Sequence, residues 1–254
     1  MDVILLSHLG LGDNILNIPI VYYLLETYNN VYFVCFKHNL NNLKYIFNFD
    51  DKVKFLSFNS SEEIKNTFKN KSQKYLNGKL ILRYGLHNIN SNIASFPFFM
   101  YDDLNIDRNI MKTHFKVRNT NKSLELLELI KNNKYIFLSN ETSRGELFNI
   151  DKLLTQYNID KKEILIICSN ANIYNSNDKF YNIANKFVYK SNDIELIDYK
   201  LVLENANFII LSDSSLFTFA SFLNLNKGNK LVTRTDSVEW NNFLSFIENK
   251  FTLD

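Results

Sequence analysis

Two glycines and an acid lie in the turn that follows the first apolar segment of the chain, residues 3–6. Gly10 and Gly12 let the backbone turn sharply and leave room for a ligand to approach. Asp13 comes next, at the start of a predicted helix, where its carboxylate can cap free backbone N–H groups or accept a proton as a general base. The residues alone leave both uses open. His8 lies in the same turn and is a second candidate for contact with a substrate.

A second polar cluster lies far along the chain, between the apolar segment 208–211 and a predicted helix. It consists of Ser212, Asp213, Ser214 and Ser215. The first turn of a helix presents free N–H donors and a partial positive charge, so this helix start suits a diphosphate. Ordinary N-capping by Asp213 or Ser214 is the competing interpretation.

A third cluster follows the predicted strand 135–139 and contains Thr142, Ser143 and Arg144. Hydroxyl groups and a guanidinium at the carboxyl end of a strand suit the oxygens of a phosphate. Arginine in particular binds phosphate with a defined direction. A solvated surface arginine is the alternative.

Short apolar segments alternate with amphipathic ones along the whole chain, which is typical of β-α-β units and a parallel sheet. Strands are expected at 3–6, 31–36, 54–58, 79–83, 135–139, 164–168, 208–211 and 230–233. Helices are expected at 15–28, 61–68, 123–132, 150–157, 180–187, 199–204 and 216–223, with an irregular connection over 85–117. Because two such series part near residue 118, the sequence predicts two Rossmann-like parallel-sheet domains, 1–118 and 119–254, facing across a cleft. Ligands of such sheets bind beyond the carboxyl ends of the strands, where the three clusters fall.

Composition narrows the function classes. The 254 residues, 46% of them hydrophobic, suffice for two domains of modest size. The net charge of +2 comes without a cluster of basic residues, which argues against a nucleic-acid partner. No apolar run reaches the roughly 18 residues of a membrane span, and an acid at position 2 argues against a signal peptide. We therefore expect a cytoplasmic protein.

No cofactor is expected. A dinucleotide fingerprint would require glycine at Ile15, so NAD binding is not indicated. The four histidines have no metal-ligand spacing, and no Asp-x-Asp triplet calls for a divalent metal. Cys35 and Cys168 lie inside apolar segments and are predicted to be small buried hydrophobes, as in a reducing compartment.

Together, the motifs resemble those of the heptosyltransferases, the glycosyltransferase family 9 branch of the GT-B glycosyltransferases. The family opens with a strand, Gly-Asp and a helix containing proline; here these are residues 9–13 and Pro19. Its later signature is a strand, Asp-Ser-Gly and a small-residue helix with a histidine, which residues 212–220 resemble. Ser215 stands in place of the glycine and Thr218 in place of the histidine. The two motifs span nearly the whole chain in the family's order.

The resemblance implies transfer of a hexosyl or heptosyl group from a nucleotide-diphosphate sugar to an acceptor hydroxyl, without metal and with inversion. Asp13 would be the base that deprotonates the acceptor, which is a glycan, a lipid or another hydroxyl compound. Ser214 and Ser215 would hold the donor diphosphate, assisted by Arg144. Domain 1–118 would bind the acceptor, and domain 119–254 would bind the nucleotide sugar.

Two alternatives remain open at this point. One is a sugar-nucleotide epimerase on the same scaffold, which would release free nucleotide and an isomerised sugar without an acceptor. The other is a protein that binds nucleotide sugars without turnover, an interpretation that Ser215 and Thr218 keep open.

Overall fold

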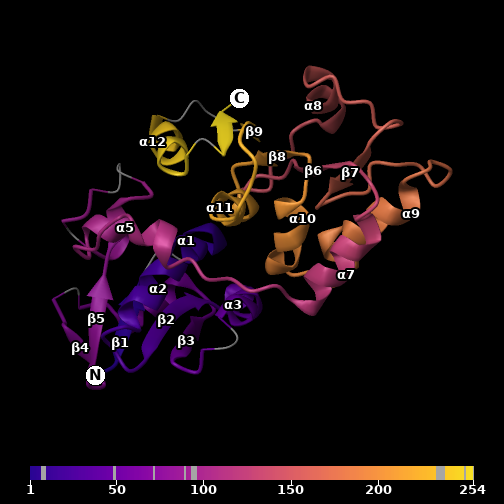
Figure 1. The fold of residues 1–254 in the computed structure, drawn as a ribbon. Helices are drawn as coiled ribbons and strands as arrows, with labels where there is room; N and C mark the ends of the chain where they lie inside the picture. Colours follow the sequence, from indigo (N-terminus) through magenta and orange to yellow (C-terminus); the bar gives the residue numbers. More distant parts are fainter. Residues whose placement is uncertain are drawn as a thin grey trace. The chain divides into compact units, whose positions relative to one another are not determined.

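A computed structural model describes residues 1–6, 10–47, 50–70, 72–88, 90–92, 96–232, 238–248 and 250–253 (Figure 1). The chain divides into two compact units, Met1–Arg118 and Asn119–Asp254. Each unit contains its own sheet, and the described strands number five in each. The predicted α/β class with two parallel sheets is confirmed, whereas their facing across a cleft stays a prediction.

The first sheet has the strand order β3-β2-β1-β5-β4. Its strands are β1 (Val3–Leu6), β2 (Val31–Phe36), β3 (Val53–Phe58), β4 (Tyr75–Leu76) and β5 (Lys79–Arg83). All pairs are parallel except β4 with β5, which form a hairpin. The hairpin turn is Asn77-Gly78, with φ of 49° and 75°, the two positive values that a tight hairpin turn requires. This edge strand is an addition to the predicted sheet.

The helices of the first unit are α1 (Leu11–Leu16), α2 (Ile18–Leu24), α3 (Leu40–Phe47), α4 (Ser61–Thr67), α5 (Phe99–Asp102) and α6 (Ile110–Thr113). The single helix predicted over 15–28 is wrong in three respects. It begins earlier, at Leu11, it is broken at Asn17, and it ends earlier, at Leu24. Pro19 explains the break, because its ring nitrogen carries no hydrogen to continue the helical hydrogen bonds.

Side chains satisfy the carbonyl groups at this break. The Asn17 amide donates to the carbonyl of Asp13 at 2.6 Å, and the Tyr101 hydroxyl donates to the carbonyl of Leu16 at 2.8 Å. The Tyr84 hydroxyl in turn donates to Oδ1 of Asn17. Tyr84 and Tyr101 are fully buried. The segment predicted as an irregular connection therefore contributes to the core and fixes the end of α1.

The second sheet is parallel throughout, in the order β10-β9-β8-β6-β7. Its strands are β6 (Tyr135–Ser139), β7 (Leu165–Cys168), β8 (Phe208–Ser212), β9 (Asn229–Val232) and β10 (Phe251–Leu253). Every residue of β6 and β7 is buried, which explains why both strands are continuous apolar runs in the sequence. β10 was not predicted.

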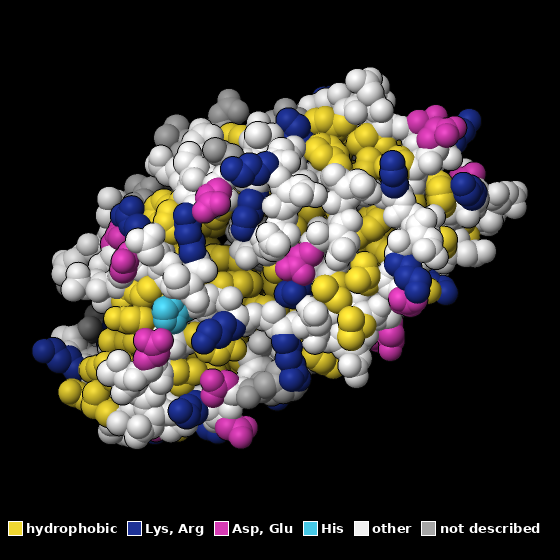
Figure 2. Space-filling model, in the orientation of Figure 1, with side chains coloured by type: hydrophobic (Ala, Val, Ile, Leu, Met, Phe, Trp, Pro, Cys, Tyr) yellow, Lys and Arg dark blue, Asp and Glu magenta, His cyan; other side chains and the backbone are white. Residues whose placement is uncertain are grey.

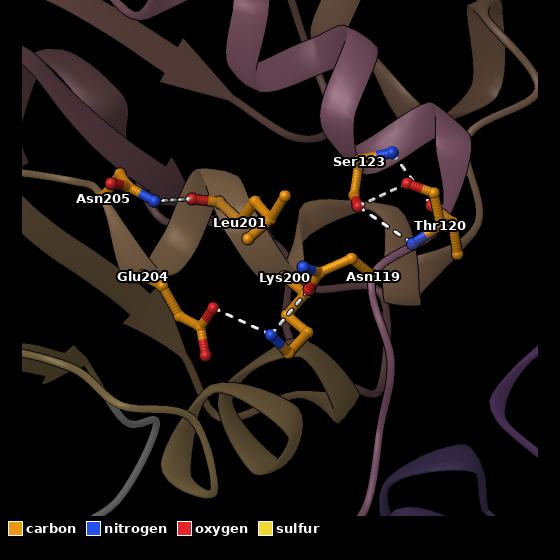
Figure 3. A network of polar contacts seen from close by, with 7 residues as sticks. All are labelled: Asn119, Thr120, Ser123, Lys200, Leu201, Glu204 and Asn205. Carbon is orange, nitrogen blue, oxygen red and sulfur yellow. Dashed lines mark hydrogen bonds and ion pairs between the residues drawn. The ribbon is translucent and has the colours of Figure 1, made fainter.

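The helices of the second unit are α7 (Asn121–Ile130), α8 (Ile150–Gln156), α9 (Tyr181–Ala184), α10 (Lys200–Glu204), α11 (Ser215–Ser221) and α12 (Val238–Phe246). A capping box starts α7, in which Thr120 and Ser123 each accept the other's backbone N–H, at 2.9 and 3.0 Å (Figure 3). Beside it, Nζ of Lys200 binds Asn119 at 2.8 Å and Glu204 at 2.9 Å. These contacts attach the first residues of the second unit to α10.

Candidate functional site

Asp13 lies at the carboxyl edge of the first sheet, in the third position of α1. The backbone N–H of Gly10 donates to its carboxylate, which is the contact made by the acid of a capping box. Burial is the larger influence and raises the pKa of Asp13 from 3.8 to about 6, while the N–H of Gly10 opposes the rise. A carboxylate of this pKa is ionised at neutral pH yet is a better proton acceptor than an ordinary aspartate. Asp13 therefore has the contact of a cap and the pKa suited to a base.

Gly10 has a steric role that is specific to this acid. A Cβ built on Gly10 would lie 3.0 Å from Oδ2 of Asp13, tighter than nine in ten real contacts of a Cβ. The absence of a side chain thus permits the N–H of residue 10 to reach the carboxylate. Gly12 was predicted in the turn, but it lies inside the first turn of α1. His8 falls outside the described residues.

A pocket of about 680 Å³ contains Asp13 and belongs entirely to the first unit. It is lined by Leu6, Gly10, Asp13, Phe36, Ser61, Ile64, Lys65, Phe68, Lys69, Arg83, Leu86 and His87. Three of these residues, Leu6, Phe36 and Arg83, end the parallel strands β1, β2 and β5. The sequence analysis missed every lining residue except Gly10 and Asp13. The rule that ligands bind at the carboxyl ends of strands was the signal that could have found Phe36 and Arg83.

In the second unit, the two polar clusters predicted to bind phosphate lie together. Their strands, β6 and β8, are neighbours in the sheet. The backbone N–H of Ser143 donates to the carbonyl of Asp213 at 3.1 Å. The Ser212 hydroxyl donates to the carbonyl of Glu141 at 2.5 Å. Residues about 70 positions apart thus form one continuous polar surface at the carboxyl ends of these strands.

The members of the cluster after β6 differ in what their side chains do. Thr142 is buried, and its hydroxyl accepts the backbone N–H groups of Arg144 at 3.3 Å and Glu146 at 3.2 Å. Thr142 therefore shapes the loop and does not present a hydroxyl to solvent. Arg144 is exposed, and no carboxylate within the described ranges pairs with its guanidinium. Ser143 is exposed as well.

The cluster after β8 begins α11, with Ser214 as the N-cap and Ser215 as the first helical residue. The predicted alternative of capping by Ser214 is not observed, because its side chain makes no capping bond. Its Oγ is buried and has no hydrogen-bond partner in the described part of the chain. Thr218, at the family's histidine position, donates its hydroxyl to the carbonyl of Ser214 at 3.3 Å.

The cysteines are buried and unbridged, as predicted. Burial raises the pKa of Cys35 to about 11, and it also raises the pKa of Cys168, so neither thiol has the acidity of a nucleophile.

Neither the models of known protein families nor the curated protein sequences give a match to this chain. Solved structures of similar fold include two glycosyltransferases. The ADP-heptose lps heptosyltransferase II of E. coli has a TM-score of 0.56 at 10% identity, covering 100% of this chain and 90% of the enzyme. This chain has a heptosyltransferase-like fold. A glycosyl transferase family 9 protein of Veillonella parvula DSM 2008 has a TM-score of 0.50 at 10% identity, with coverages of 91% and 79%. The predicted resemblance is thereby confirmed for the fold.

Charges of both signs are interspersed over the face shown in Figure 2, in keeping with the small net charge. In the ranges that the structure describes, no helix is long and apolar enough to cross a membrane. Among those same residues, no three His, Cys, Asp or Glu side chains gather as a metal would require. Metal independence, cytoplasmic location and the lack of a nucleic-acid partner stay predictions.

Proposed function

We propose that this protein transfers a sugar from a nucleotide-diphosphate sugar to an acceptor hydroxyl, with Asp13 as the general base. The observation that carries the proposal is the Asp13 carboxylate, which lines a pocket at the carboxyl edge of a parallel sheet and has a pKa of about 6. A base is most effective when its pKa lies near the working pH. The heptosyltransferase-like fold supplies the reaction class as a hypothesis.

In this reaction the acceptor hydroxyl gives its proton to Asp13 as its oxygen attacks the anomeric carbon. The bond from that carbon to the diphosphate oxygen breaks, and the electron pair leaves with the diphosphate. Attack from the opposite face inverts the anomeric centre. A metal-free site must stabilise the diphosphate with N–H donors and a cation. We assign this role to the N–H groups at the start of α11, at Ser214 and Ser215, and to the guanidinium of Arg144, with the hydroxyl of Ser143 as a further donor.

The supporting observation for this donor site is the joined polar surface after β6 and β8. Beneath this surface, the buried Oγ of Ser214 has no hydrogen-bond partner among the described residues. Asp213 and Thr142 shape that surface through the Asp213 carbonyl and the Thr142 hydroxyl. The proposal assigns the cation to Arg144, whose side chain is exposed.

The test begins with a thermal-shift screen against ADP-, UDP-, GDP- and CDP-sugars to find the donor. Release of nucleoside diphosphate and formation of a glycoside are then followed with hydroxyl acceptors. Asp13→Asn should lower transfer by about 10²–10⁴-fold and leave donor affinity unchanged, because an amide cannot accept the proton. In the wild type, kcat/KM should fall as the pH drops below about 6, where the carboxylate becomes protonated.

The exposed Asp51 provides the matched control, since Asp51→Asn makes the same chemical change outside the pocket. Near-normal turnover of Asp13→Asn would show that Asp13 only caps α1, and His8 would be the next candidate base. An isomerised sugar formed without an acceptor would instead establish an epimerase. Binding of nucleotide sugar with no turnover at all would establish a binding protein.

A further inference from the structure

Three cationic side chains line the pocket that contains Asp13. Lys65 belongs to the last turn of α4, Lys69 lies just beyond that helix, and Arg83 ends β5. Within the described ranges, none of the three forms an ion pair with an acid. Lysines near a helix C-terminus are favoured by the helix dipole, which accounts for Lys65 without any ligand. That explanation does not extend to Arg83, which comes from a strand.

Arg83 is a half-buried cation held by neutral groups. Its guanidinium donates to the carbonyl of Gln73 at 2.5 Å and to the carbonyl of Asn70 at 3.3 Å. Both acceptors orient the guanidinium, but neither carries the negative charge that would compensate it. Burial accordingly lowers the pKa of Arg83. A desolvated cation without a counter-charge costs stability, and an anionic ligand in the pocket would offset that cost.

Apart from Asp13, Ser61 and His87, the remaining side chains that line the pocket are apolar. Leu6, Ile64 and Phe68 belong to the buried core of the first unit, and Phe36 packs against that core while staying partly exposed. Leu86 adds a side chain that is 65% exposed. A sugar ring with hydroxyls on all sides would leave several of them unpaired against this wall, whereas an aliphatic or aromatic body would bury it favourably. The volume of about 680 Å³ suits a small molecule.

We propose that this pocket takes a small amphipathic anion as the acceptor: a phosphate or carboxylate near Lys65, Lys69 and Arg83, an apolar body against Phe36 and Phe68, and the reacting hydroxyl at Asp13. The role of this anion as the acceptor rests on the proposed function, whereas its binding to the pocket does not depend on that function. With Asp13 ionised, three cations face one carboxylate, so the pocket attracts an anion at neutral pH.

Isothermal titration calorimetry at pH 7.5 tests the binding with five probes: phenyl phosphate, benzoate, inorganic phosphate, benzyl alcohol and glucose. Phenyl phosphate or benzoate should bind at least about tenfold more tightly than each probe that lacks either the charge or the ring, since a buried ring contributes favourable apolar burial. Whichever of phenyl phosphate and benzoate binds more tightly identifies the anionic group of the ligand as phosphate or carboxylate. Glucose binding as tightly as the aromatic anions would overturn the proposal.

Lys65→Gln and Lys69→Gln locate the anion site, because both lysines are exposed and their replacement leaves the core intact. Each should weaken the better aromatic anion about three- to tenfold, as for a partly solvated charge contact. Lys54→Gln is the control, an exposed lysine on β3 outside the pocket lining. Equal affinities for all three variants and the wild type would refute the assignment.

These measurements require no turnover, so their failure is distinguishable from failure of the proposed function. If the aromatic anions bind as expected while Asp13→Asn retains normal transfer, the pocket assignment stands and the base assignment falls. If Asp13→Asn abolishes transfer while the lysine variants bind every probe normally, the base stands and the amphipathic acceptor is refuted.

Discussion

Replacing Asp13 with Asn should stabilise the protein at neutral pH, even though it removes the proposed base. Asn retains an oxygen that can accept the N–H of Gly10, but it carries no charge to desolvate. The pKa of Asp13 rises from 3.8 to about 6 on folding, and one pKa unit corresponds to about 1.4 kcal/mol. The ionised carboxylate therefore costs the folded state about 2–3 kcal/mol at pH 7.5, a cost that the variant does not have.

The pH dependence has a definite sign. Because the folded pKa is the higher one, the folded state binds more protons than the unfolded state between pH 3.8 and about 6. The stability supplied by the protonated carboxyl is fully present below the lower value and is lost as the pH rises through the upper one. The stability of Asp13→Asn relative to the wild type should therefore grow by about 2–3 kcal/mol between pH 4 and pH 7.5.

Urea denaturation followed by circular dichroism at several pH values measures this difference, in which the titration of all other groups cancels. Asp51→Asn is the matched control, because it makes the same chemical change at an exposed residue in a turn. A constant difference between Asp13→Asn and the wild type from pH 4 to pH 7.5 would refute the burial of this carboxylate as the origin of its raised pKa.

Three further substitutions test other contacts. Gly10→Ala should displace the Asp13 carboxylate, since the new Cβ would lie 3.0 Å from Oδ2. This variant should therefore have a lower kcat with little change in melting temperature, and an unchanged kcat would contradict this contact. Arg144→Ala should weaken nucleotide diphosphate binding by about 1–3 kcal/mol in calorimetry, and equal affinity would exclude Arg144 from the donor site. Tyr84→Phe should destabilise the first unit by about 1–3 kcal/mol in urea, because it removes a buried donor to Asn17; unaltered stability would show that this hydrogen bond contributes little.

The elements of the fold that can be predicted from the sequence are those specified by residues close together along the chain. β1, β2 and β6 begin and end where the sequence predicts, because a strand buried on both faces is a short continuous apolar run. The hairpin at Asn77-Gly78 also has a local signal, which was overlooked. The break at Asn17 has a local signal in Pro19, but the contacts that stabilise it do not, since Tyr101 donates to the carbonyl of Leu16 and Tyr84 to Oδ1 of Asn17. A partner so distant in sequence has no local pattern.

The same distinction applies to the candidate site. Asp13 and the clusters at Arg144 and Ser214 were found because each lies in the turn or loop that follows a predicted strand. Lys65 and Lys69 were not found, because α4 reaches the Asp13 pocket only through the packing of the sheet. Their positions in the sequence do not differ from those of lysines on a solvated helix.

The contact of a helix cap and the raised pKa that suits a base occur together at Asp13. An aspartate selected only to cap a helix gains from its N–H contact, and that contact lowers its pKa and stabilises the fold at neutral pH. Here the contact with Gly10 is present, yet the net pKa is about 6, so burial outweighs the cap. At pH 7 Asp13 is therefore ionised, which is the form that accepts a proton, and this form lowers the stability of the folded protein. Residues that destabilise the fold in this way are typical of functional sites, and helix capping does not explain the destabilisation. The N–H of Gly10 then fixes the orientation of the carboxylate, while its burial in the pocket sets its basicity.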